Sequence, residues 1–165
     1  IIGVLAAVAI PAFINYVKRS KTSEAPNNLK LLFEGAATYY QRERWSSGVI
    51  AMGGAAAANT YCTVNTAMCT YRATNTKTSV DWSAQPPSFA ALDFSPADPL
   101  YFEYHIRAGM AGCGQRPNRR NIYTFRANAD LDGDMIESRF ELAVGSNMDN
   151  ELFRAPGIYV ENELE

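Results

Sequence analysis

The chain begins with an apolar run, since residues 1–14 contain no charged side chain and no side-chain amide. As an α-helix this run extends about 21 Å at 1.5 Å per residue, less than the ~30 Å hydrocarbon core of a bilayer. We therefore expect that it does not span a membrane alone, and that roughly ten more apolar residues would complete a span. The lack of an initiator methionine predicts that upstream residues exist in the natural chain.

Two residues weaken a helix in this apolar run. Pro11 removes one backbone hydrogen bond at a cost of about 3 kcal/mol, and Gly3 costs up to about 1 kcal/mol relative to alanine. Unmade backbone bonds are costly in hydrocarbon unless neighbours shield them, so the pattern indicates packing against other copies. Lys18, Arg19 and Lys21 follow directly. They do not fix an orientation in a membrane, because the positive-inside rule compares both flanks and the other flank precedes the sequence.

A second helical stripe follows the basic residues. Apolar side chains recur there at the spacing of one helix face, at Leu29, Leu32, Phe33, Ala36, Ala37 and Tyr40. Pro26 is expected either to bend the helix or to start a new segment, and residues 46–48 to end it. We expect this second half of the helix to pack on a sheet.

After the helix the pattern changes to a long connection and then to strands. Residues 46–98 are rich in small residues and prolines, with one short helical turn expected at residues 90–92. Beyond them, segments with the period of half-buried strands lie at residues 100–107, 122–127, 135–144 and 157–160. In the third of these Ile136, Phe140, Leu142 and Val144 are expected to face inward. The bridge between the second and third is short and contains Asp-Gly, which predicts an antiparallel hairpin.

The order of these elements predicts an α+β fold. A long amino-terminal helix would pack on a small antiparallel β-sheet, and a long loop would join the helix to the sheet. Residues 1–25 would form an exposed hydrophobic helix. Residues 26–165 would form a globular head, comprising the second half of the helix, the loop 46–98 and the sheet 99–160.

Composition narrows the function only a little. Of the 165 residues 47% are apolar and 19% charged, and the net charge of −2 gives no bias toward nucleic acid, so we expect no nucleic-acid binding. The three cysteines form no CxxC pair and there is one histidine, which argues against a zinc site. Cys62 and Cys69 are close in one loop and are the first choice for a disulfide, with Cys113 an alternative partner for either.

The opening segment IIGVLAAVAIPAFINYVKRSKTSEA resembles the amino-terminal helix of type IV pilins and related pseudopilins, entered partway. The likeness includes the interval from Gly3 to Pro11 and the aromatic residues followed by basic residues after it. More loosely, the segments FEGAATYY, DPLYFEY and DLDGD and the terminal ELE resemble major type IVa pilins of the myxobacterial type. In that family the mature chain begins with a methylated phenylalanine followed shortly by a glutamate. Both would precede Ile1 and are absent from this sequence.

The resemblance implies a structural protein and not an enzyme. It implies a precursor held in the inner membrane by this helix, handled by the pilus assembly machinery there, and then built with identical subunits into a helical surface pilus for motility and adhesion. It also implies that residues 3–11 lose helicity on assembly. The residues expected in the filament core are Ile1, Ile2, Gly3, Leu5, Val8, Ile10, Pro11, Phe13, Ile14 and Val17. Two other interpretations stay open: a pseudopilin of a type II secretion system or a minor pilin, and a monomeric anchored domain that binds through residues 46–99.

The stretch NADLDGDMIE is the strongest candidate in the chain for a metal-binding site. Oxygen-bearing side chains stand at the first, third and fifth places of an EF-hand-like loop, with glycine at the sixth, and such ligands suit Ca²⁺. The candidate ligands are Asn128, Asp130, Asp132 and Asp134. The twelfth place holds Arg139 where a calcium loop has a bidentate glutamate, and Asp-Gly also marks hairpin turns. A calcium site and a plain acidic turn therefore both remain open, and no other cofactor is expected.

The sequence offers no arrangement typical of an active site. His105 has no serine or cysteine at motif spacing, and the segment MGGAAAAN lacks the lysine of a phosphate-binding loop. We therefore expect no catalytic residues.

Overall fold

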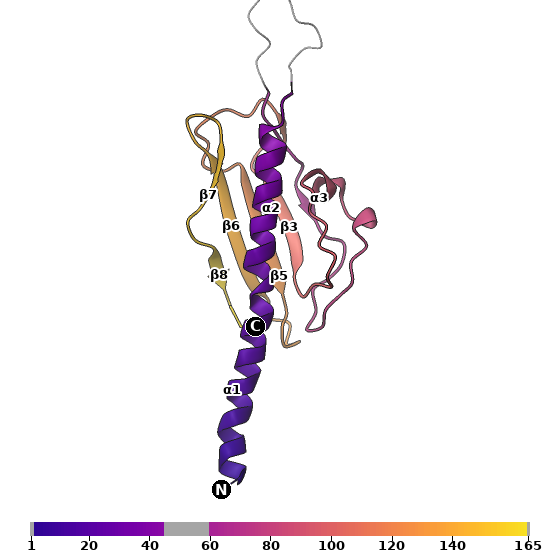
Figure 1. The fold of residues 1–165 in the computed structure, drawn as a ribbon, viewed down its shortest axis with the longest axis vertical. Coiled ribbons are helices and arrows are strands. Elements are labelled where there is room, and N and C mark those ends of the chain that lie inside the picture. The colour runs from indigo at the N-terminus through magenta and orange to yellow at the C-terminus, as the bar shows by residue number, and fades with distance from the viewer. Residues whose placement is uncertain (1, 45–59, 165) are drawn as a thin grey trace, which may run out of the picture.

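A computed structural model of the protein describes residues 2–44 and 60–164. Two helices in near continuity form its axis, α1 (Ile2–Thr22) and α2 (Glu24–Gln41). Figure 1 shows α2 lying across one face of a β-sheet, while α1 projects beyond the end of that sheet. The helix ends at Gln41, before the end expected at residues 46–48. Residues 46–48 and the first part of the expected loop lie outside the described residues.

The α2 helix is bound to the sheet by the expected stripe. Ala25, Leu29, Leu32, Ala36 and Tyr40 are fully buried, while the other two predicted members, Phe33 and Ala37, are partly buried against the same core. Pro26 lies in the first turn of α2, where the backbone N–H it lacks has no partner within a helix in any case. It therefore accompanies the start of a new helical segment, which was one of the two expected outcomes.

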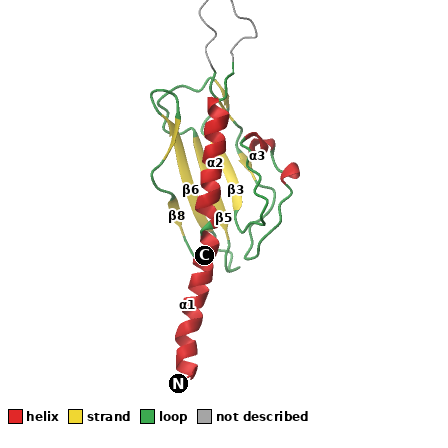
Figure 2. Ribbon diagram, viewed as in Figure 1, coloured by secondary structure: helices red, strands yellow, loops and turns green. Residues whose placement is uncertain are grey.

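The sheet is antiparallel throughout. The strands are β1 (Cys62–Thr63), β2 (Ala67–Met68), β3 (Glu103–Ala108), β4 (Gly112–Cys113), β5 (Tyr123–Ala129), β6 (Ser138–Ser146), β7 (Leu152–Arg154) and β8 (Tyr159–Glu161). The main sheet has the order β2-β3-β5-β6-β7, with β8 also paired to β6, and β1 pairs with β4 in a separate two-stranded sheet. The α+β fold is thus confirmed, with the helix and the sheet as two layers (Figure 2).

The strands agree with the sequence pattern except at short elements. Tyr104, Ile106, Phe140, Leu142 and Val144 face the core as expected. Ile136 was expected to face inward and does not, because β6 begins two residues later and Ile136 lies in the turn before it, 49% exposed. The described part of the long connection expected at residues 46–98 contains more structure than the one helical turn that was expected. It holds β1, β2, a 3-10 turn (Trp82–Ala84) and α3 (Pro87–Ala91), which overlaps the expected turn at residues 90–92 and ends one residue before it.

The disulfide joins Cys62 to Cys113, so the expectation of a Cys62–Cys69 pair is wrong. Antiparallel pairing of β1 with β4 sets Cys62 directly opposite Cys113. Cys69 lies just after β2, where its backbone N–H bonds to the carbonyl of Tyr104 and its side chain is buried in the core as a free thiol. Closeness along the chain was a poor guide, because β2 carries Cys69 to a different sheet.

Gly35 allows α2 to approach the segment after α3. A Cβ added at Gly35 would lie 1.9 Å from the backbone oxygen of Leu92. Gly35→Ala is therefore expected to destabilise the fold by about 1–3 kcal/mol, as overpacking does, even though alanine favours a helix by about 1 kcal/mol. Chemical denaturation followed by circular dichroism measures the change. Gly157→Ala is the control, since a Cβ there meets nothing within 4 Å. A Gly35→Ala variant as stable as the parent chain would contradict this packing.

Candidate assembly surface

Several large apolar side chains are exposed side by side on α1. Ile10, Phe13, Ile14 and Tyr16 are 60%, 67%, 49% and 71% exposed, and Pro11 is exposed beside them. Val17 is half-buried. Large adjacent apolar side chains in water mark an interaction site. The structure therefore leaves this part of the expected filament core in need of a partner.

The remaining residues of the expected core belong to the start of α1. Ile2, Gly3, Leu5 and Val8 lie within the helix, while Ile1 is outside the described residues. The helix passes through Pro11 without ending, so no loss of helicity between Gly3 and Pro11 occurs in the isolated chain. Within residues 2–44 and 60–164, no helix combines the length and hydropathy that a membrane crossing needs.

Two lysines near the carboxyl end of α1 bind this helix to the head. The Lys18 ammonium lies 2.8 Å from a carboxylate oxygen of Asp132. The Lys21 ammonium donates to the backbone oxygens of Asn75 and Leu131 at 3.0 and 3.1 Å, and it lies 5.1 Å from the ring centroid of Tyr101. These contacts join the helix to the turn between β5 and β6 and to Asn75 and Tyr101, so they set the direction in which α1 leaves the head.

A half-buried carboxylate, that of Glu24, completes this junction. Glu24 accepts hydrogen bonds from the backbone N–H groups of Tyr101 and Phe102 and from the hydroxyl of Tyr104. The same hydroxyl accepts a bond from the Asn28 amide at 2.7 Å. Burial, together with the Glu24 charge, raises the pKa of Tyr104 well above its usual range. Sequence reasoning missed this junction, and its only signal was an acidic residue at the first position of a helix.

The acidic turn brings together three of the four candidate calcium ligands. Carboxylate oxygens of Asp130, Asp132 and Asp134 lie within 4.8 Å of one another. Each also accepts a backbone N–H of its own turn, and Lys18 donates to Asp132, which lowers the pKa of that carboxyl. Asn128 lies on β5 opposite Arg139, and its Oδ1 has no hydrogen-bond partner among the described residues.

Calcium binding at this turn remains a prediction. If the ion binds, adding millimolar CaCl₂ to chelator-treated protein raises the melting temperature, and Asp130→Asn removes that rise. An unchanged melting temperature, with no heat of binding in calorimetry, would leave only the acidic turn held by Lys18 and its own backbone.

Charged side chains cover the helix-free face of the sheet. His105 lies 3.0 Å from Glu103, Arg126 pairs with Glu141 at 2.6 Å, and one more pair links β6 to β8. His105 is therefore paired with Glu103 on the face of the sheet away from the helix. These side chains make this face polar, in contrast to the apolar exposed surface of α1.

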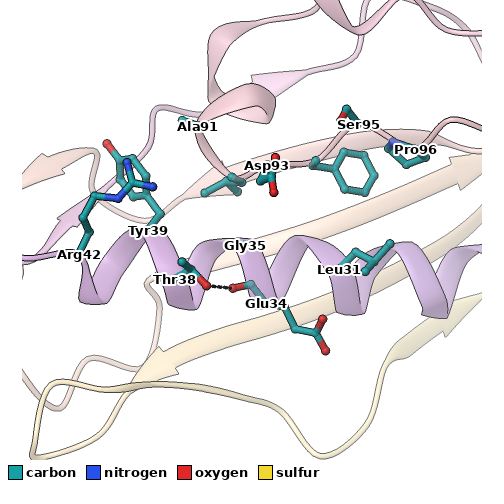
Figure 3. Close-up of a pocket in the computed structure, with 12 residues that line it drawn as sticks. Leu31, Glu34, Gly35, Thr38, Tyr39, Arg42, Ala91, Asp93, Ser95 and Pro96 are labelled. Atoms are coloured by element: carbon teal, nitrogen blue, oxygen red, sulfur yellow. Dashed lines mark hydrogen bonds between the residues drawn. The ribbon is translucent and has the colours of Figure 1, made fainter.

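Two open hollows lie one after the other along one side of α1 and α2. One, of about 450 Å³, is bounded by α2 and by residues 91–96 (Figure 3). The other, of about 720 Å³, lies between the junction of the helices and residues 96–101. Leu31 and Pro96 line both hollows, so together they form one groove, here called the side groove. The helical side of the groove is lined by Phe13, Tyr16, Val17, Ser20, Lys21, Ser23, Glu24, Asn27, Asn28, Leu31, Glu34, Gly35, Thr38, Tyr39 and Arg42.

The free thiol of Cys69 is chemically protected. Burial raises its pKa from the ordinary value of 9.0 to about 11. A raised pKa means that folding favours the protonated thiol. This contribution to stability is full below the pKa of the unfolded thiol and is lost as the pH rises toward 11.

We therefore expect iodoacetamide at pH 8.5 to leave Cys69 unmodified in the folded chain and to alkylate it rapidly in denaturant, because the thiolate is the nucleophile. Mass spectrometry measures the modification, and Cys69→Ala identifies the labelled site. Equal labelling of the folded and denatured chains would show that the thiol is not buried.

Comparison with known proteins gives one partial similarity. The chain is 49% identical over 47 residues to the type IV major pilin protein PilA of Myxococcus xanthus (strain DK1622). The matched part covers 28% of this chain and 21% of that protein, so the chain spans about a fifth of the length of the relative. No family model matches the chain, and no solved structure matches it. The similarity and the long helix on a disulfide-bonded sheet support a pilus subunit at the level of the family.

Proposed function

We propose that the chain is a structural subunit of a type IV pilus, in which identical copies assemble into helical surface filaments. The observation that carries this proposal is the exposed apolar surface of α1, which projects beyond the head and which no described residue of the same chain covers. The partial similarity to a type IV major pilin supports the same function.

Assembly in this proposal is driven by packing. Burying the apolar surface of α1 gains about 25 cal/mol for each Å² removed from water. Before assembly α1 resides in the inner membrane, where lipid already covers that surface. Moving from lipid to filament therefore gains little hydrophobic energy, and packing between helices becomes decisive. An energy-consuming assembly machinery in the membrane then supplies the direction.

The head remains at the filament surface in this proposal and has no catalytic role. The charged, helix-free face of the sheet is suited to water. Extension and retraction of the filaments would give motility and adhesion. A pseudopilin of a type II secretion system or a minor pilin is the alternative, since the same helix would serve it equally well.

Deletion of the gene in the cells that produce the chain tests the proposal. The deletion strain is expected to lose its surface filaments in electron micrographs and to lose surface motility, and the wild-type gene on a plasmid restores both. Filaments that persist unchanged in the deletion strain, together with a loss of protein secretion, would favour the pseudopilin and reject the pilus.

A further inference from the structure

We propose that the larger hollow of the side groove binds the headgroup of an aminophospholipid, with its phosphate between Lys21 and Lys77 and its ammonium against Asp98. The acyl chains then lie against the apolar surface of α1. This inference rests on the proposed function, because the residence of α1 in the membrane before assembly brings the hollow to the level of the headgroups. Its evidence comes from the two lysines, from the carboxylates of the hollow and from its position along α1.

Two lysine ammonium groups lie against one aromatic ring in this hollow. The ammonium of Lys21 lies 5.1 Å from the centroid of the Tyr101 ring, and that of Lys77 lies 5.4 Å from the same centroid. Within the described residues neither lysine forms an ion pair with a carboxylate. A tyrosine ring stabilises a cation by only about 0.5–1 kcal/mol where water reaches it, and like charges near each other repel. An anion between the two lysines would remove that repulsion.

Both lysines keep hydrogen-bond donors that a phosphate can use. The Lys21 ammonium donates to two backbone oxygens of the head, and an ammonium has a further N–H group to give. The Lys77 side chain is exposed, and its ammonium has no hydrogen-bond partner among residues 2–44 and 60–164. Bonds from ammonium groups to phosphate oxygens are strong because donor and acceptor are both charged. Since the head already holds the Lys21 ammonium in place, one half of the phosphate site is preformed.

Two carboxylates line the same hollow, and they differ in what they bind. Glu24 accepts hydrogen bonds from two backbone N–H groups and from the hydroxyl of Tyr104, so the head already uses its charge. Asp98 is exposed and accepts no hydrogen bond from any described residue. The hollow therefore offers cations and one available anion to the same ligand. Phosphoethanolamine carries the matching phosphate and an ammonium that donates hydrogen bonds, whereas a choline headgroup has no N–H to donate.

The hollow lies where α1 changes from apolar to charged. Its lining begins at Phe13, Tyr16 and Val17 and continues to Lys21. Residues 1–17 carry no charge and extend about 25 Å as a helix, so hydrocarbon around them places Lys21 at the membrane surface. Tyrosine is enriched at this level of a membrane, and lysine directs its ammonium toward the headgroups. The volume of about 720 Å³ lies within the range of roughly 300–1,000 Å³ that is typical of small-molecule sites.

Native mass spectrometry of the full chain in a non-ionic detergent tests the proposal. Short-chain phosphatidylethanolamine is titrated against the protein, with phosphatidylcholine and phosphatidylglycerol of the same chain length as comparisons. We expect a single phosphatidylethanolamine to be retained by each chain, with a dissociation constant several-fold lower than that of either comparison lipid. O-Phosphoethanolamine, which is the headgroup without acyl chains, should bind much more weakly because it makes no contact with the apolar surface of α1.

Matched variants separate the two charges of the headgroup. Lys77→Gln is expected to weaken the binding of phosphatidylethanolamine and phosphatidylglycerol alike by about tenfold, the effect of losing a charge-assisted hydrogen bond. Asp98→Asn should weaken phosphatidylethanolamine alone and so remove its advantage over phosphatidylglycerol. Lys30→Gln is the control, because Lys30 is exposed on α2 outside the hollow and should change neither affinity. Circular dichroism checks that each variant remains folded.

The outcomes separate this inference from the proposed function. Equal retention of the three lipids, full retention by Lys77→Gln, or an unchanged lipid preference in Asp98→Asn overturns the headgroup site and leaves the pilus subunit intact. Binding of O-phosphoethanolamine as tight as that of the lipid overturns the lipid as the ligand and indicates a soluble phosphate ester. Filaments that persist in the deletion strain overturn the function on which the inference rests, whichever lipid the purified chain retains.

Discussion

Replacing Phe13 with aspartate is expected to abolish filament formation while the head remains folded. Phe13 is 67% exposed on α1, and the described head core contains no α1 residue, so the isolated fold loses little. In a filament the aspartate would be buried among apolar helices without a partner, which costs several kcal/mol for each subunit. Repeated along a polymer, that cost is prohibitive.

The yield of sheared filaments and the melting temperature measure the two parts of this result. Phe13→Leu keeps the apolar character and should form filaments. Met148→Asp changes an even more exposed apolar residue, in the turn before β7, and should also leave assembly intact. Immunoblots of the membrane fraction confirm that the variants are produced. Normal piliation by Phe13→Asp would refute the assignment of α1 to the filament core.

Removing the disulfide is expected to cause the largest loss of stability from a single covalent change. Cys62 and Cys113 are separated by 51 positions, and closing a loop of this length restricts the unfolded chain by about 4 kcal/mol. For a chain of this size the double variant Cys62→Ser/Cys113→Ser should melt roughly 8–16 °C lower. Peptide mapping without a reductant should find Cys62 linked to Cys113.

The matched control is Cys69→Ala, which keeps the disulfide and should remain sensitive to a reductant. The double serine variant should show no further change when a reductant is added. A Cys62–Cys69 link in the peptide map, or a double variant as stable as the parent chain, would contradict the pairing of β1 with β4.

Local sequence patterns predicted the parts of the fold that local physics controls. The stripe from Leu29 to Tyr40 has the period of a helix face, and the alternation around Tyr104 and Ile106 has the period of a strand. In each case the buried side chains follow the period because one face of the element must pack on the core. The helix and the strands predicted from these periods agree with those of the structure.

Contacts between distant residues could not be predicted in the same way. The β1 and β4 strands have two residues each, too few to show a period, and their pairing decides which cysteines meet. The bond between Lys18 and Asp132 joins residues 114 positions apart. The side groove likewise needs residues 91–101 to lie beside the helix, and their sequence carries no signal of that position.

Analysis of filaments sheared from the producing cells tests the central claim most directly. Cryo-electron microscopy with mass spectrometry would give both the main protein and its arrangement. The account predicts that this chain is the dominant protein of thin helical fibres, with α1 at the centre and the sheet outside. Fibres made of another protein, with this chain retained in the membrane fraction, would contradict it.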